Sequence, residues 1–310
     1  MKISIITPSF NQADYLEQTI RSVLDQDYPA LEYLIADGAS TDGSLALIKK
    51  YSERLAWWAS EIDAGQADAI NKGFSRATGE IIAWLNSDDY YLPETLATVA
   101  KLFAENPNAG IIYGDVLSVD GAGNPINVQR FAQYSVEDLM QFKIISQPGV
   151  FMRRSVLEQA GYLDQNYHFL LDHQLWLRMA QLAQMVYVPQ TLAVARYHDD
   201  AKNIAHAEKF GAEAFKILEW MNTQPMLRSL LKKNRTKVLA GAHHLDAFYL
   251  VEAGKMRQGL AAYARAFFNH PPTALKSWKR IVYAVLSLLG FSRVREVYVN
   301  RKRKRIERKR

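Results

Sequence analysis

The first 120 residues alternate short apolar runs with amphipathic stretches, and this alternation limits the possible fold more than any other feature. The run Lys2–Ile6 is apolar and β-branched, and Pro8 closes it, which is typical of a buried strand that ends in a loop. The pattern predicts a helix over residues 13–26, further strands at 31–37, 80–85 and 110–116, and further helices at 40–51, 67–77 and 93–105. Strands that alternate with helices indicate an α/β fold, with a mostly parallel sheet covered on both faces.

Polar segments follow three of the predicted strands at the point where each strand ends. They are Thr7–Asn11, Asp37–Asp42 and Asn86–Asp89. Ligands of open α/β sheets bind beyond the carboxyl ends of the strands. We therefore expect these three segments to line one shared crevice.

The string WLNSDDYYLPE places two adjacent carboxylates, Asp88 and Asp89, directly after a buried strand. Two such carboxylates repel each other unless a cation lies between them and a ligand, and their hard oxygens suit Mg²⁺ or Mn²⁺. A divalent cation at this position would bridge diphosphate oxygens. The same string also fits a turn with a helix N-cap, because Ser and Asp before a Pro-led helix are common.

Other polar residues are ambiguous when each is taken alone. Asp37 lies in IADGASTDGS, which is also good turn and capping chemistry. The segment with Asp63, Asp68 and Asn71 fits a solvated helix start equally well. These residues therefore need further context.

Asp172 stands among five apolar side chains at helical spacing in HFLLDHQLWLRMA. That much apolar surface would raise the pKa of its carboxyl and make it a candidate general base, although it could also be an N-cap residue. His198 and Lys202 lie in ARYHDDAKN. A lone His is more often a surface or core residue, but near a diphosphate this pair would bind a metal and offset charge.

From about residue 206 onward the pattern predicts helices only. They are Phe210–Met221, Arg228–Val251 and a pair around the turn Glu252–Lys255, which resembles one tetratricopeptide-type hairpin. We expect a catalytic domain over residues 1–205, a helical extension over 206–290 and a polybasic tail over 291–310.

The tail accounts for the positive charge of the chain. Residues 291–310 hold ten Lys or Arg and two Glu, a local net of +8, so the formal +6 leaves −2 for residues 1–290. A near-neutral body argues against a nucleic-acid partner. A basic tail behind the apolar stretch Ile281–Phe291 favours an anionic membrane surface, with a solvated end or a nucleic-acid patch as the alternatives.

The expected location follows from what the chain lacks. No window reaches the ~18–20 apolar residues of a membrane-spanning helix, and the N-terminus has no secretory pattern. The absence of cysteine fits a reducing compartment. We expect a cytoplasmic protein held peripherally on the inner face of the cell membrane.

Six strings, in one order, resemble the family 2 glycosyltransferases, which have the GT-A fold with a Rossmann-like mixed sheet flanked by helices. The resemblance covers residues 1–205. The strings are SIITPSFNQADYLEQTIRSVLDQDYP, IADGASTDGS, DAGQADAINKGFSRATGEIIAWLNSDD, QPGVFMRRSVLEQAGYLD, LLDHQLWLRMA and ARYHDDAKN.

The resemblance implies a role for each candidate residue. Nucleotide-sugar contacts fall on Thr7, Pro8, Asp37, Asp63, Asp68, Asn71, Asn86, Ser87 and Lys202. The string NSDD matches the DxD element of the family with Asn86 in place of its first Asp. The implied ligands of Mn²⁺ or Mg²⁺ are therefore Asp88, Asp89 and His198, and the implied catalytic base is Asp172.

The implied reaction is a single inverting displacement from a nucleoside diphosphate sugar onto an acceptor hydroxyl. UDP is slightly favoured over GDP and dTDP, and the expected acceptor is a cell-envelope glycan or a lipid-linked glycan. A dehydrogenase is disfavoured because TPSFNQ stands where a GxGxxG loop would follow the first strand. A catalytically inactive scaffold that binds nucleotide sugars at the membrane is the remaining alternative, and the presence of Asp88, Asp172, His198 and Lys202 together argues against it.

Overall fold

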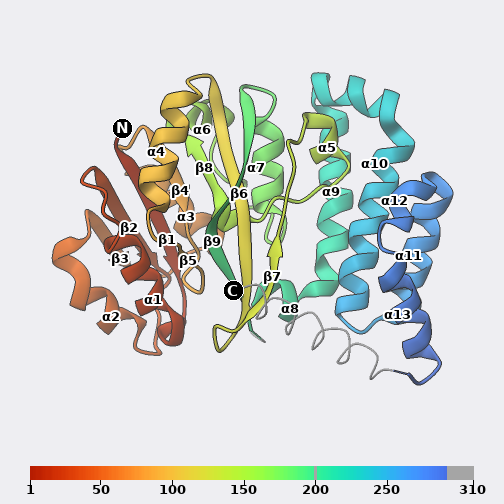
Figure 1. The fold of residues 1–310 in the computed structure, drawn as a ribbon, viewed down its shortest axis with the longest axis horizontal. Coiled ribbons are helices and arrows are strands. Elements are labelled where there is room, and N and C mark those ends of the chain that lie inside the picture. Colours follow the sequence, from red (N-terminus) through yellow and green to blue (C-terminus); the bar gives the residue numbers. More distant parts are fainter. Residues whose placement is uncertain (199–200, 292–310) are drawn as a thin grey trace. The chain divides into compact units, whose positions relative to one another are not determined.

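A computed structural model describes residues 1–198 and 201–291 of the chain (Figure 1). It contains two compact units. The sheet unit comprises residues 1–119, 128–133 and 145–196, and the helical unit comprises residues 120–127, 134–144 and the described residues from 197 onward. The predicted boundary after residue 205 thus falls inside the helical unit, and the division into three regions stays a prediction.

The first half of the sheet consists of parallel strands in the order β3-β2-β1-β4, joined by helices on its faces (Figure 1). The strands are β1 (Ile3–Ser9), β2 (Leu31–Asp37), β3 (Trp57–Ser60) and β4 (Ile81–Trp84). The connecting helices are α1 (Ala13–Leu24), α2 (Ser44–Tyr51), the short η1 (Ser52–Arg54) and α3 (Gln66–Phe74). The pairing register places Ser9 beside Asp37 and Asp37 beside Ser60, so three strands end at one edge.

The second half of the sheet is antiparallel where its register is defined. β8 (Val150–Arg153) pairs antiparallel with β4 and with β6 (Ala109–Asp120), and β5 (Tyr90–Tyr91) pairs antiparallel with β9 (Gln184–Tyr197). β7 (Pro125–Gln129) pairs with β6. The remaining elements of this part of the chain are α4 (Thr95–Glu105), α5 (Val136–Met140), η2 (Gln147–Gly149), α6 (Arg154–Ala160) and α7 (Leu171–Met179). The sheet is therefore mixed rather than mostly parallel, because β8 inserts between β4 and β6.

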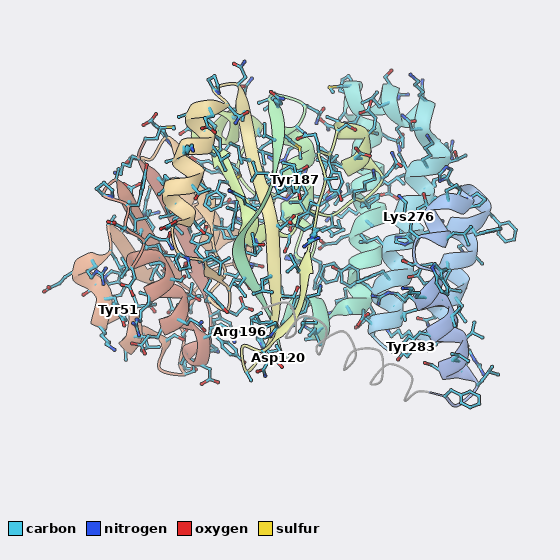
Figure 2. All side chains as sticks on the ribbon, viewed as in Figure 1. Tyr51, Asp120, Tyr187, Arg196, Lys276 and Tyr283 are labelled. Atoms are coloured by element: carbon cyan, nitrogen blue, oxygen red, sulfur yellow. The ribbon has the colours of Figure 1, made fainter. Side chains whose placement is uncertain are left out.

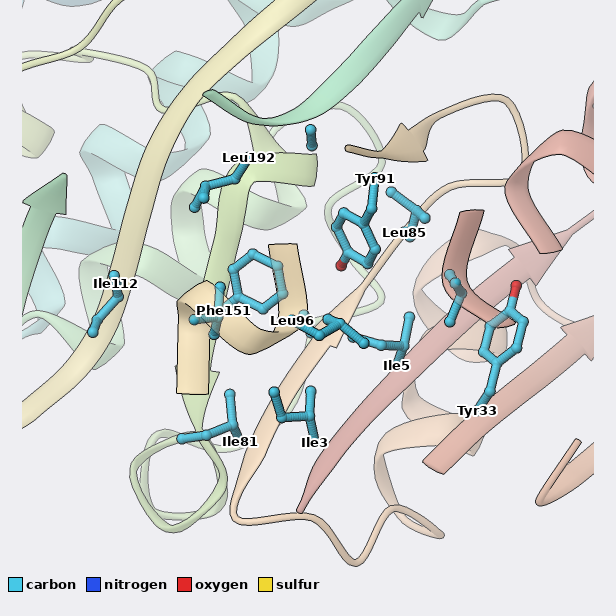
Figure 3. Packing of buried hydrophobic residues seen from close by; sticks show 14 of the residues in the cluster. Ile3, Ile5, Tyr33, Ile81, Leu85, Tyr91, Leu96, Ile112, Phe151 and Leu192 are labelled. Carbon is cyan, nitrogen blue, oxygen red and sulfur yellow. The ribbon is translucent and has the colours of Figure 1, made fainter. Parts of the chain in front are cut away.

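The core of the sheet unit is built from alternate residues of the strands. Ile3 and Ile5 of β1 are fully buried and pack with Tyr33 and Ile81 from the neighbouring strands (Figure 3). Thr7 continues the same alternation, so its side chain is also buried. Each aliphatic side chain that is fully buried in this way contributes about 1.5–3 kcal/mol to folding.

Glu32 forms a buried polar cluster near the amino ends of β1 and β2. Its carboxylate accepts hydrogen bonds from Lys2 Nζ at 2.6 Å, from the Thr78 backbone N–H at 2.7 Å and from Ser4 Oγ. Burial alone would raise the pKa of Glu32, but these donors outweigh it and lower the pKa to about 2. The charged form of Glu32 therefore stabilises the fold.

We expect Glu32→Gln to lower the free energy of unfolding at pH 7 by about 2–3 kcal/mol. The folded pKa lies below the unfolded value of about 4.3, so this stabilisation is complete above that value and is lost as the pH falls toward 2. Urea titrations at several pH values measure it. The exposed Glu53→Gln serves as the control, and a Glu32→Gln curve parallel to wild type between pH 5 and 3 would contradict the assignment.

The helical unit follows the predicted pattern closely. It contains α8 (Lys202–Ala205), η3 (Ala207–Lys209), α9 (Phe210–Thr223), α10 (Pro225–Glu252), α11 (Met256–Asn269), α12 (Pro271–Leu275) and α13 (Trp278–Leu288). The predicted turn at 252–255 separates α10 from α11, with Gly254 at a φ of +75° that favours glycine. None of the helices in the described ranges is long and apolar enough to cross a bilayer. The predicted tail, from residue 292 onward, lies outside the described residues.

Candidate active site

The loops that follow β1, β2 and β3 meet at Gly38. A Cβ atom at Gly38 would lie 2.8 Å from Asp63 Oδ2 and 3.2 Å from Phe10 Cδ2, so only glycine fits without displacing them. The Phe10 side chain is 61% exposed and that of Ile62 is 87% exposed. Sequence reasoning missed Phe10, although an aromatic residue within the polar segment after β1 was a usable signal. The three loops thus bring an exposed aromatic ring and a carboxylate close to Gly38.

Asp37 connects the loop after β2 to β3 through hydrogen bonds. Its carboxylate accepts hydrogen bonds from the Ser40 backbone N–H at 3.0 Å and from Ser60 Oγ at 2.6 Å. Thr7 and Pro8 are buried, and Thr7 Oγ1 lies 2.9 Å from the Tyr33 hydroxyl. The nucleotide contacts predicted for these three residues stay predictions. In this conformation, Asp37 holds the loop after β2 in place.

The polar residues before and within α3 are tied to neighbouring loops. Asp63 Oδ1 accepts a hydrogen bond from the Gly65 N–H at 2.8 Å. The backbone N–H of Ala64 lowers the pKa of Asp68, and the ion pair with Lys72 adds to this. Asn71 exchanges two hydrogen bonds with the backbone of Leu163, at 2.8 and 3.0 Å. These contacts fix α3 beside the crevice, and the donor-binding roles of Asp63, Asp68 and Asn71 stay predictions.

The segment Asn86–Asp89 forms the floor of the site directly after β4. Thr19 Oγ1 donates to the backbone carbonyls of Ser87 at 2.9 Å and of Asp89 at 2.7 Å, which anchors the segment to α1. Asn86 Oδ1 accepts from Gln66 Nε2 at 2.8 Å. Asp88 is half-buried, whereas Ser87 and Asp89 are buried. Asp88 is therefore the carboxylate of this segment with the greatest access from solvent.

Arg196, near the end of β9, contacts the segment that holds the two carboxylates and was missed by sequence reasoning (Figure 2). Its backbone N–H donates to Asp89 Oδ1 at 3.0 Å, and its Nε donates to the Asp88 carbonyl at 3.1 Å. The guanidinium also lies 4.8 Å from the ring centroid of Tyr15 and 5.7 Å from that of Tyr90. A buried Arg within an otherwise apolar strand was the available signal.

Burial raises the pKa of Asp89 well above its ordinary value, and the negative charge of Asp88 raises it further. A cation beside the pair would favour the ionised form of both carboxylates. No group of three or more His, Cys, Asp or Glu capable of holding a metal occurs within the described ranges. The oxygens of Asp88 and Asp89 nevertheless fit Mg²⁺ or Mn²⁺, because these ions commonly take one or two carboxylates and complete their shell with water and phosphate oxygens.

Asp172 lies on helix α7, which packs against β4 through a pair of stacked tryptophans. It lies in the first turn of α7, whose N-cap is Leu170, so the N-cap interpretation of Asp172 is wrong. One turn further along α7, the ring of Trp176 stacks on that of Trp84, with a centroid separation of 5.3 Å. Trp84 ends β4, two residues before Asn86. The stack therefore joins the helix that holds Asp172 to the strand that precedes the two carboxylates.

Two further polar groups lie around this stack. Gln147 Nε2 donates to the Trp84 carbonyl at 2.7 Å. Among the residues that the structure describes, neither Gln147 Oε1 nor Trp176 Nε1 has a hydrogen-bond partner. A buried acceptor and a buried donor of this kind are able to bond hydroxyl groups of a ligand.

His198 and Lys202 belong to the helical unit, on the segment that follows Arg196 along the chain. His198 is half-buried, and Lys202 is exposed at the start of α8. Their predicted contacts with a metal and a diphosphate stay predictions.

Comparison with known proteins identifies the family. The profile described as Glycosyl transferase family 2 matches residues 4–161, about half of the chain. TuaG of Bacillus subtilis, a glycosyltransferase named for teichuronic acid biosynthesis, is 32% identical over 182 residues, covering 57% of this chain and 71% of TuaG. TarS of Staphylococcus aureus, a poly(ribitol-phosphate) β-N-acetylglucosaminyltransferase, is 30% identical over 130 residues, covering 40% of this chain and 22% of TarS.

Solved structures share the fold at low sequence identity. TarS residues 1–349 with UDP-GlcNAc superpose with a TM-score of 0.60 and 17% identity, covering 90% of this chain and 92% of that one. The mannosyltransferase PcManGT of Pyrobaculum calidifontis with GDP-Man and Mn²⁺ superposes with a TM-score of 0.59 and 21% identity, covering 94% and 86%. The predicted GT-A fold is thereby confirmed. With residues 4–161 matching the family profile, the chain belongs to glycosyl transferase family 2 and is related to enzymes of cell-wall polysaccharide synthesis.

Proposed function

We propose that this chain transfers a sugar from a nucleoside diphosphate donor to an acceptor hydroxyl with inversion at the anomeric carbon. The observation that supports the proposal is the Trp84–Trp176 stack, in which a residue of α7, the helix that holds Asp172, packs against the last residue of β4, four residues before Asp88. A cation-binding carboxylate for the departing diphosphate and a separate carboxylate for the incoming hydroxyl are what a single displacement requires.

The nucleotide occupies the crevice after β1, β2 and β3 in this proposal. The exposed ring of Phe10 offers a surface on which a nucleobase stacks, and the half-buried Asp63 offers a carboxylate for base or ribose. The neighbours named above bind UDP-GlcNAc and GDP-Man, so both nucleotides are candidates. We favour UDP, because the TuaG and TarS relatives both act in cell-wall polysaccharide synthesis and TarS binds a UDP-sugar.

The diphosphate lies over the segment after β4. Asp88 would hold Mn²⁺ or Mg²⁺ there, with Asp89 as a further ligand. When bound, the cation offsets the negative charge that develops on the leaving diphosphate. The metal contact of His198 and the diphosphate contact of Lys202 stay predictions from the sequence resemblance. Asn86 and Ser87 connect β4 to Asp88 and thereby position this cation ligand.

Asp172 accepts the proton of the acceptor hydroxyl as its oxygen attacks the anomeric carbon. One carbon–oxygen bond forms while the bond to the diphosphate breaks, and the nucleoside diphosphate leaves with the bonding electrons. Gln147 Oε1 and Trp176 Nε1 provide an acceptor and a donor for sugar hydroxyls beside this carboxylate. No covalent sugar intermediate is needed.

The acceptor in this proposal is a cell-envelope polysaccharide or a lipid-linked glycan. The names of TuaG and TarS support an envelope polymer. The basic residues of the C-terminal sequence support a peripheral position on the cytoplasmic face of the membrane, where such acceptors are assembled.

Isothermal titration of UDP, GDP and dTDP, each with Mn²⁺ and with EDTA, tests the donor site. One nucleotide should bind with Mn²⁺ and at least about tenfold more weakly with EDTA, a difference of about 1.4 kcal/mol. Binding of none of the three in either condition would contradict the proposal.

Arg196 is a positioning residue for the metal site in this scheme. We expect Arg196→Ala to raise the Mn²⁺ concentration at half-maximal activity by about tenfold, because it removes the hydrogen bond from Nε to the Asp88 carbonyl and the positive charge near Asp89. Arg196→Lys should restore only part of the Mn²⁺ affinity, since lysine lacks the planar guanidinium with its several hydrogen-bond donors. Arg76→Ala is the control, as Arg76 also stacks on a ring, that of Trp57, at 4.3 Å. An unchanged Mn²⁺ requirement in Arg196→Ala would remove this role.

A further inference from the structure

Helix α13 carries an exposed apolar stripe that the proposed reaction does not use. We call it the α13 stripe. Its members recur at helical spacing and continue just beyond the helix, and each is 42–67% exposed. They are Trp278, Val282, Val285, Leu288, Leu289 and Phe291.

The opposite face of α13 is already occupied within the helical unit. Ala284 is fully buried in a small core with Val251 and Tyr263, from α10 and α11 (Figure 1). Arg280 forms an ion pair with Glu252, and its guanidinium lies 3.8 Å from the ring centroid of Phe248. These contacts fix the rotation of α13, so the stripe points away from the helices against which α13 packs.

The α13 stripe is larger than a scatter of single exposed side chains. Isolated apolar residues are normal on a protein surface, but contiguous apolar patches mark surfaces that meet a partner or a membrane. Trp278, Val282, Val285 and Leu289 are three or four residues apart, so they lie along one face of α13 and form such a patch, with Leu288 and Phe291 beside it.

Charge decides which partner fits. No Asp or Glu occurs between Glu252 and Glu296, whereas eight Lys or Arg do. Lys276, labelled in Figure 2, is exposed just before α13. Lys279 is also exposed, and its Nζ lies 5.7 Å from the ring centroid of Trp278. An apolar stripe flanked by Trp and lysine, with further basic sequence behind it, matches the interface of an anionic bilayer. A purely apolar protein groove would leave these charges without a role.

We infer that α13 lies flat on an anionic lipid surface, with the α13 stripe at the boundary between head groups and acyl chains. The flanking basic residues meet the lipid phosphates. This inference deepens the proposed function by naming the surface through which the chain reaches a membrane-borne acceptor, and it rests on that function only for the identity of the acceptor.

Vesicle sedimentation tests the inference with the full chain. Vesicles of phosphatidylglycerol and phosphatidylcholine are compared with vesicles of phosphatidylcholine alone. The test variant is Val282→Ser/Val285→Ser/Leu289→Ser, and the matched control is Met226→Ser, because Met226 is 45% exposed on α10. Wild type and control should bind the anionic vesicles, and the triple variant should bind them at least about tenfold more weakly.

A second comparison separates the contribution of the basic C-terminal residues to vesicle binding from that of the α13 stripe. A chain that ends at residue 291 should bind anionic vesicles more weakly than wild type and with a smaller dependence on salt. Equal vesicle binding by wild type and the triple variant overturns the inference. So does a wild-type dimer that the triple variant abolishes without any vesicle binding, since a second copy would then cover the stripe.

The nucleotide titration keeps the two proposals apart. The triple variant should melt at the wild-type temperature and bind nucleotide as wild type does. Intact vesicle binding with no nucleotide binding would sink the proposed function and leave the α13 surface standing. Intact nucleotide binding with no vesicle binding would overturn the α13 inference and leave the proposed function standing.

Discussion

Replacing Asp172 by asparagine is expected to lower the rate of sugar transfer by about 10³-fold while leaving donor affinity within about twofold of wild type. General base catalysis contributes about 10²–10⁴-fold in enzymes. Asparagine keeps the shape of the side chain but cannot take the proton of the acceptor hydroxyl. Single-turnover rates and nucleotide titrations on the same preparation measure the two effects.

The control for this variant is Asp164→Asn, which removes a half-buried carboxylate from the loop before α7. Asp164 Oδ1 accepts hydrogen bonds from Asn166 and has no part in the proposed reaction. A wild-type rate in Asp172→Asn, or an equal loss in Asp164→Asn, would contradict the role of Asp172 as the base.

Replacing Asp88 by asparagine should remove the effect of Mn²⁺ on nucleotide binding. In the presence of Mn²⁺ we expect nucleotide affinity to fall at least about tenfold, to the value that wild type shows with EDTA, because a neutral amide is a poor ligand for a hard cation. Titration of nucleotide into the variant with and without Mn²⁺ measures this.

Asp89→Asn makes a useful comparison. The two oxygens of the buried Asp89 carboxylate accept hydrogen bonds from the Arg196 backbone N–H and from Asn86 Nδ2. Asparagine has only one acceptor oxygen, so this replacement should disturb the segment as well as the cation. We expect lower thermal stability in Asp89→Asn than in Asp88→Asn. A Mn²⁺ effect that survives in Asp88→Asn would move the metal site away from this carboxylate.

The sequence predicted the sheet unit well where strands are buried on both faces. β1, β2 and β4 appear as mostly apolar runs, because both faces of a parallel strand are covered by helices. β3 escaped prediction because it is four residues long and half-buried throughout. The antiparallel β8 was missed as a strand between β4 and β6, since hydrophobic pattern carries no information about strand direction or neighbours.

The sequence likewise predicted the candidate-site residues at strand ends but not those that depend on tertiary contacts. Loops at strand ends identified Asp37 and Asp88, because ligand position follows from the topology of the sheet. Arg196 and Gln147 were not identified, since they contact Asp88 and Trp84, which are more than sixty positions away from them in the chain. The stack of Trp176 on Trp84 is likewise a tertiary contact that helical spacing alone does not show.

The most direct test of sugar transfer is NMR of donor turnover with water as the acceptor. The wild-type chain is incubated with UDP-, GDP- and dTDP-sugars and Mn²⁺, and the anomeric signals of the released sugar are followed from the earliest times. We predict release from one nucleotide class, with the anomer opposite to that of the donor formed first. Early release of the donor's own anomer would contradict inversion, and no release from any donor would contradict the assignment as an active glycosyltransferase.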